Sequence, residues 1–120
     1  MKECVVPRWQ QLKSQLNNLS EEEFLLALHR DDAAVCIDAR TPEEFAVSHI
    51  PKSINLNYLS TDLADQLEAL DPEKSYYVYC RTSRRSSRIC VLLENMGFDK
   101  VYHLKEGMKN YDHLIASQTK

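Results

Sequence analysis

The stretch SYYVYCRTSRRSSRICVLLENMG, residues 75–97, decides the expected fold. Its first part, residues 75–79, is aromatic and β-branched, which is typical of a strand. Its last part spaces apolar residues at i, i+3, i+4 and i+7, as the buried stripe of a helix does. Those residues are Ile89, Leu92, Leu93 and Met96. Gly97 then follows as a helix-ending residue. A strand, a short loop and a helix in this order favour an α/β domain.

Working outward from this stretch, the chain alternates short apolar runs with helical patterns. The apolar runs predict strands at residues 33–38, 53–56 and 100–104. The run at 33–38 does not alternate with polar residues, as expected for a strand buried on both faces of a parallel sheet. We therefore expect an α/β fold with a mainly parallel central sheet and helices on both faces.

Two capping boxes predict where helices begin. Ser20 with Glu23 precedes an apolar run, and Thr41 with Glu44 brackets Pro42 at the first helical position. Helices are also expected over residues 62–70 and from about residue 106 onward. The first thirty residues are predicted to be helical, with residues 1–19 as an N-terminal helical extension and residues 20–120 as the domain.

The composition suits one globular domain. The chain has 120 residues, 43% hydrophobic and 28% charged, which is enough for a single core. A net charge of -3 argues against a nucleic-acid partner. The opening MKECVVPRWQ lacks the apolar region of a secretory signal, and no apolar run is long enough to span a membrane. We expect a cytoplasmic protein without a membrane partner.

The cysteines are predicted to be reduced thiols rather than two disulfides, because the expected compartment is reducing. They are Cys4, Cys36, Cys80 and Cys90. None of them stands in a CxxC spacing, so neither zinc nor another metal site is expected.

Cys80 is the candidate nucleophile. It lies where the predicted strand of residues 75–79 ends, and ligands of parallel α/β sheets bind beyond the carboxyl ends of strands. Loop amides and a helix N-terminus there lower the pKa of a thiol and attract anions. Four arginines within eight residues add positive charge: Arg81, Arg84, Arg85 and Arg88. We expect Cys80 to react first with iodoacetamide.

Three motifs in this order resemble the rhodanese family. The loop Cys80–Ser86 is similar to the family's Cys-Arg-x-Gly-x-Arg-Ser. Upstream, residues 38–40 and 44–53 resemble the family's Asp-x-Arg, acidic-aromatic pair and Gly-His-Ile-Pro-Gly-Ala. Near the end, residues 104–107 resemble Leu-x-Gly-Gly, with Tyr111 at the family's Trp position. The resemblance covers about residues 20–116 and implies a rhodanese-like three-layer domain.

Three positions depart from the family's pattern. Ser83, Lys52 and Glu106 each replace a family glycine. If position 83 needs a positive φ, serine there costs about 1 kcal/mol.

What the resemblance implies is sulfur transfer through a Cys80 persulfide. A donor such as thiosulfate would give its outer sulfur to Cys80, which would pass it to a thiol or protein acceptor. No metal or organic cofactor is required. The predicted substrate-binding residues are those of the loop and one arginine upstream: Arg81, Thr82, Ser83, Arg84, Arg85 and Arg40.

Two alternative functions stay open. A cysteine-dependent phosphatase places arginine after Cys and five residues, which is Ser86 in this chain, whereas Arg85 comes one position earlier. A shorter loop favours sulfur over phosphate, although Arg84 could partly compensate. A non-catalytic rhodanese-fold module that binds a protein or an anion is the other alternative, but such a module tends to lack the cysteine.

Several residues near the site are predicted to be structural. Asp38 and Arg40 end a buried strand, and an ion pair between Arg40 and Glu44 is the favoured interpretation over donor binding. His49, just before a proline, is interpreted as a structural hydrogen-bonding residue rather than a general base. The other histidines, His103 among them, form no recognisable constellation.

Overall fold

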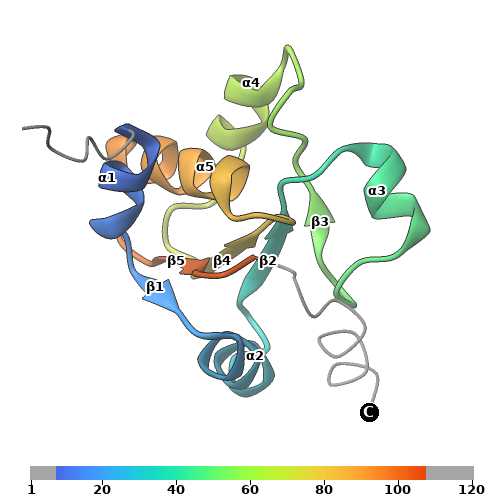
Figure 1. Ribbon diagram of the computed structural model, residues 1–120, viewed down its shortest axis with the longest axis vertical. Helices are drawn as coiled ribbons and strands as arrows, with labels where there is room; N and C mark the ends of the chain where they lie inside the picture. Colours follow the sequence, from blue (N-terminus) through green and yellow to red (C-terminus); the bar gives the residue numbers. More distant parts are fainter. Residues whose placement is uncertain (1–7, 108–120) are drawn as a thin grey trace, which may run out of the picture.

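The computed structural model describes residues 8–107 (Figure 1). Five parallel strands form one sheet in the order β1-β5-β4-β2-β3. They are β1 (Asn18–Leu19), β2 (Val35–Asp38), β3 (Ile54–Asn55), β4 (Tyr76–Tyr79) and β5 (Val101–Leu104). The central strands β2 and β4 follow the predicted apolar runs. Cys4, Tyr111 and the expected closing helix after residue 107 lie outside the described residues.

Helices cover both faces of this sheet, as expected. They are α1 (Arg8–Ser14), α2 (Glu21–Arg30), α3 (Pro42–Val47), α4 (Leu63–Glu68) and α5 (Arg84–Asn95). Figure 1 shows α1, α4 and α5 on one side of the sheet and α2 on the other. The three-layer α/β architecture is therefore confirmed. Among these helices none is long and apolar enough to traverse a membrane.

Side chains that alternate along β4 supply two hydrophobic cores. Val78 and Cys80 face α5 and pack with its Ile89 and Leu93. Tyr77 and Tyr79 face the other way and pack with Phe24 of α2. Because the strand is buried on both faces, it shows no hydrophobic alternation in the sequence.

Both predicted capping boxes are present. Ser20 and Glu23 exchange hydrogen bonds at the start of α2, and Thr41 and Glu44 do so at the start of α3. Each satisfies backbone N–H groups that the first helical turn leaves without a partner. The second box fixes Glu44 close to the end of β2.

Two details of the predicted secondary structure are wrong. Leu19 lies in the edge strand β1 rather than in a continuous N-terminal helix, because Asn18 and Leu19 pair with β5. Leu92 of α5 and Met96 directly after this helix are about 40% exposed (39% and 42%), whereas Ser86 and Cys90 are buried. The buried face is rotated because the first turn of α5 packs on Cys80.

Candidate active site

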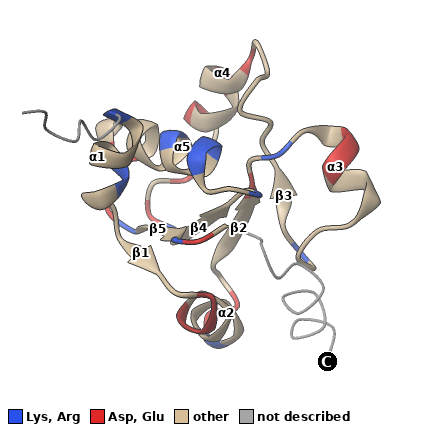
Figure 2. Ribbon diagram, viewed as in Figure 1, with Lys and Arg blue, Asp and Glu red and all other residues tan. Residues whose placement is uncertain are grey.

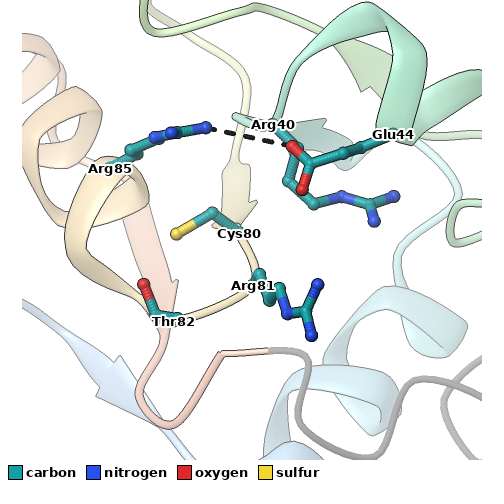
Figure 3. Close-up of a pocket in the computed structure, with 6 residues that line it drawn as sticks. All are labelled: Arg40, Glu44, Cys80, Arg81, Thr82 and Arg85. Atoms are coloured by element: carbon teal, nitrogen blue, oxygen red, sulfur yellow. Dashed lines mark ion pairs between the residues drawn. The ribbon is translucent and has the colours of Figure 1, made fainter.

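Cys80 stands at the end of β4, directly before the loop that starts α5. Its side chain is almost fully buried, at 1% exposure, yet it contributes to the wall of a pocket of about 140 Å³. Figure 3 shows the residues that line this pocket. They are Arg40, Glu44, Cys80, Arg81, Thr82 and Arg85. The pocket thus combines a thiol with charged side chains from two neighbouring strand ends.

The sulfur of Cys80 is held by the first turn of α5. The Ser86 backbone N–H donates to Sγ at 3.3 Å, and the thiol donates to Ser86 Oγ at 3.2 Å. Within residues 8–107, no group accepts a hydrogen bond from the backbone N–H groups of residues 81–85. Such free amides at a helix N-terminus favour a bound anion.

Ser83 holds the tight turn in this loop. Its φ is 71°, the left-handed region that favours glycine, so the family glycine is replaced at a position that needs positive φ. Ser83 is 2% exposed, does not line the pocket, and its Oγ accepts from Lys13 Nζ of α1 at 2.9 Å. The N-terminal helix is therefore bonded directly to the active-site loop.

Gly107 is the glycine that the loop requires from the third motif. A Cβ at this position would lie 2.4 Å from the carbonyl oxygen of Arg81, and its φ is 75°. Glu106, where the family has the first glycine, is exposed and has no positive φ. This departure therefore leaves the loop contact intact.

The predicted arginines separate into two groups. Arg81 and Arg85 line the pocket, whereas Arg84 does not and instead lies over the Trp9 ring at 5.6 Å. Figure 2 shows the basic residues gathered on the first turns of α5. Arg85 Nη1 lies 3.9 Å from Glu44 Oε1, the ion pair drawn in Figure 3. Arg85 therefore lines the pocket while its guanidinium is paired with Glu44.

Arg40 forms a hydrogen-bonded ion pair with Asp38, and the predicted partner Glu44 adds a weaker electrostatic attraction. Its Nε and Nη2 donate to both carboxylate oxygens of Asp38, the shortest at 2.8 Å, and Nη2 also donates to the Ser48 carbonyl at 2.6 Å. The Tyr79 hydroxyl also donates to Asp38 Oδ2, at 2.8 Å. Figure 3 shows the Arg40 guanidinium turned away from the Cys80 sulfur. Arg40 therefore borders the pocket mainly with its stem.

Glu44 carries negative charge into the pocket. Its carboxylate accepts hydrogen bonds from the Thr41 N–H and hydroxyl. These bonds lower the pKa of Glu44 despite partial burial, and the positive charges of Arg40 and Arg85 lower it further. Glu44 was expected to be structural and is both a helix cap and a pocket residue. His49 lies apart from the pocket, stacked on Phe45 at 3.7 Å with its Nδ1 2.8 Å from the Phe45 carbonyl.

His103 lies next to this site, a contact that was not predicted from the sequence. It is fully buried on β5, and its Nε2 lies 2.7 Å from Ser86 Oγ, the hydroxyl that also contacts Cys80. Its Nδ1 lies 2.8 Å from Asn18 Oδ1 on β1. The available signal was a histidine inside a predicted buried strand, since a buried imidazole needs hydrogen-bond partners.

The other described thiols, Cys36 and Cys90, are buried and unpaired. Burial raises the pKa of both, so they remain protonated core residues. In the described part of the chain no three candidate ligands come together as a metal site.

Comparison with known proteins agrees with this geometry. Residues 20–114 match the family model of the Rhodanese-like domain. The thiosulfate sulfurtransferase GlpE of Pseudomonas syringae is 32% identical over 90 residues, 75% of this chain and 83% of its own length. The putative sulfurtransferase YtwF of Bacillus subtilis is 28% identical over 98 residues, 82% of this chain and 92% of its own.

A solved structure shares the fold. The polysulfide-sulfur transferase of Wolinella succinogenes superimposes with a TM-score of 0.73 at 24% identity, over 88% of this chain and 80% of its own. With the family match over most of its length and the loop built around Cys80, this chain belongs to the rhodanese-like domain family.

Proposed function

We propose that the protein is a sulfurtransferase that carries sulfane sulfur on Cys80. The observation that carries the proposal is the position of the Cys80 sulfur against the start of α5, with an N–H donor at 3.3 Å and loop amides that bond no group within residues 8–107. These donors can hold a thiolate or a persulfide anion in a pocket that also contains Arg85. Membership of the family and similarity to named sulfurtransferases support the same activity.

The reaction proceeds in two displacement steps once the thiol has lost its proton. The Cys80 thiolate attacks the outer sulfur of a donor such as thiosulfate, the sulfur–sulfur bond of the donor breaks, and sulfite leaves with that electron pair. A Cys80 persulfide anion remains. A thiophilic acceptor such as cyanide or a thiolate then attacks the outer sulfur, and the Cys80 thiolate is regenerated.

Arg81, Thr82 and Arg85 are the proposed contacts for the anionic donor, because they line the pocket around the thiol. Ser83 and Arg84 do not line the pocket. Ser83 shapes the loop, and both residues contact α1. Arg40 acts by holding the end of β2 through Asp38.

The loop geometry favours sulfur over phosphate transfer. A phosphatase would need an arginine at position 86, where this chain has a buried serine bonded to Cys80. Arg84, which could have substituted for it, lies over Trp9 instead of lining the pocket. A small pocket with its thiol in direct contact with the helix start suits a single added sulfur atom.

We also propose a reducing, cytoplasmic site of action, supported by the three unpaired thiols among residues 8–107. The expected partners are a small sulfur donor and a thiol or protein acceptor, without a cofactor, nucleic acid or membrane.

The test is thiosulfate:cyanide sulfurtransferase activity of the wild type, Cys80→Ser and Cys90→Ala. Thiocyanate formation is expected in the wild type and in Cys90→Ala, which removes a buried thiol away from the pocket, and not in Cys80→Ser. Thermal unfolding of each variant checks that the fold is retained. A folded, reduced wild type without turnover, or a Cys80→Ser variant with full turnover, would refute the proposal and favour the binding-module alternative.

A further inference from the structure

A chain of hydrogen bonds leads from the Cys80 sulfur into the interior of the protein. Cys80 Sγ contacts Ser86 Oγ at 3.2 Å, Ser86 Oγ contacts His103 Nε2 at 2.7 Å, and His103 Nδ1 contacts Asn18 Oδ1 at 2.8 Å. Cys80, Ser86 and His103 are each at most 1% exposed. The parallel register that pairs Asn18 with His103 sets these two side chains next to each other.

The donors and acceptors along this chain are fixed from its inner end. Asn18 Nδ2 donates to the Lys13 carbonyl at 2.8 Å and to the Leu16 carbonyl at 3.3 Å, so the amide oxygen is the atom that faces His103. An amide oxygen only accepts, and His103 Nδ1 therefore carries the hydrogen. In the neutral ring Nε2 is then an acceptor for the Ser86 hydroxyl. Ser86 Oγ in turn accepts the thiol hydrogen of Cys80.

We propose that His103 is the internal proton acceptor for the Cys80 thiol, reached through the Ser86 hydroxyl. The thiol proton passes to Ser86 Oγ while the Ser86 hydroxyl proton passes to His103 Nε2. Two bonds to hydrogen break and two form, so Ser86 ends as a neutral hydroxyl that now donates to the thiolate. The products are a Cys80 thiolate and a His103 imidazolium, with total charge unchanged. This inference rests on the proposed role of Cys80 as nucleophile.

The surroundings of His103 let its ring take up a proton only when Cys80 is a thiolate. Burial, together with Lys13 of α1, lowers the pKa of His103 to about 4, and the Ser83 carbonyl opposes this shift. The imidazole is therefore neutral while Cys80 is a thiol, as the relay requires. A thiolate one hydroxyl away supplies the negative charge that stabilises the imidazolium, and Asn18 on β1 supplies a neutral acceptor for its other N–H.

The test is the pH dependence of Cys80 alkylation by iodoacetamide, measured by peptide mass spectrometry on the full-length protein. His103→Gln keeps a hydrogen-bonding amide near Ser86 but takes up no proton. The pKa of His103 starts at about 4, and an opposite charge moves a titration by about one to three pH units, so the imidazolium persists beside the thiolate only at mildly acidic pH. Labelling of Cys80 in His103→Gln is therefore expected to slow most below neutral pH, by up to about tenfold at pH 6. His29→Gln makes the same substitution at an exposed histidine of α2 and is the matched control.

A purely structural role for His103 predicts a different result. It would lower the thermal stability of His103→Gln and leave the rate of labelling at pH 6 unchanged, which would overturn the inference, as would faster labelling at that pH. If His103→Gln does not fold, Ser86→Ala cuts the relay and keeps the backbone N–H on the sulfur; the same slowing at pH 6 is expected there, and its absence is equally refuting. Labelling needs no sulfur donor, so this result is independent of whether the protein transfers sulfur.

Discussion

Lys52 and Ser83 both hold left-handed backbone, with φ of 70° and 71°, at positions where the family has glycine. Replacing each with glycine relieves the same local strain, but the two side chains differ in their contacts. Lys52 is exposed, and no described residue bonds its side chain. The Ser83 hydroxyl accepts from Lys13 Nζ at 2.9 Å. We therefore predict that Lys52→Gly stabilises the protein and that Ser83→Gly does not.

The magnitudes follow from two opposing contributions. Left-handed backbone costs a residue with a side chain about 1–2 kcal/mol, and glycine avoids this cost. Glycine also loses more chain entropy on folding, which cancels roughly 0.5–1 kcal/mol of the gain. Lys52→Gly should thus raise the free energy of unfolding by about 1 kcal/mol. In Ser83→Gly, loss of a partly buried hydrogen bond worth about 1 kcal/mol offsets that gain.

Urea unfolding followed by far-ultraviolet circular dichroism measures both variants, together with Lys13→Met and Lys13→Met/Ser83→Gly. Once Lys13 is gone, Ser83→Gly should stabilise as much as Lys52→Gly does. Equal stabilisation by the two glycines in the wild-type background would show that the bond from α1 to the loop contributes nothing, and the reasoning would be refuted.

Three further predictions concern the pocket and its supports. Arg40→Ala leaves the Asp38 carboxylate buried without its ion-pair partner and should cost about 3–5 kcal/mol in urea unfolding, with little change in KM for thiosulfate; a large KM rise at unchanged Tm would contradict the structural role. Arg85→Ala should raise KM for thiosulfate while Tm changes little, because its ion pair is half-exposed and worth about 0–1 kcal/mol; an unchanged KM would remove Arg85 from the site. Gly107→Ala should sharply reduce turnover, because the added Cβ would lie 2.4 Å from the Arg81 carbonyl oxygen. Gly97→Ala, whose Cβ would meet no atom within 4 Å, should leave turnover intact. Equal loss of turnover in both variants would mean that the close contact at Gly107 is irrelevant.

The parts of the fold that local chemistry determines were predictable. Capping boxes act within one helical turn, and both were found where the sequence indicated them. Strand β4 was readable from its aromatic and β-branched residues. The strand at Leu19 was missed because two residues of edge strand are defined by pairing with β5, more than 80 residues away in the chain.

The position of the Cys80 thiol and its loop in the pocket was predictable, but the residues around them were not. Cys80, Arg81 and Arg85 lie within six consecutive residues and together line the pocket. Asp38 was not predicted as the main ion-pair partner of Arg40. The choice between Asp38 and Glu44 depends on the direction of the side chains at the end of β2, which residue spacing does not determine. The contacts of His103 could not be predicted, because its partners Ser86 and Asn18 come from α5 and β1.

The burial of Ser86 changes part of the buried face predicted for α5: Ile89 and Leu93 are buried as expected, whereas Leu92 is not. A helix stripe read from hydrophobicity alone assigns polar residues to solvent, but Ser86 is buried because it bonds both Cys80 and His103. Leu92 is turned outward as a result. Sequence periodicity therefore misplaces a helix face where the helix begins in a polar site.

The central claim is that Cys80 carries sulfane sulfur, and intact mass spectrometry after incubation with thiosulfate tests it most directly. The wild-type protein should gain the mass of one sulfur atom, localised to the peptide that contains Cys80, and lose it on addition of cyanide, while Cys80→Ser gains nothing. A wild-type mass that does not change, or a sulfur atom found on Cys36 or Cys90 instead, would contradict the account.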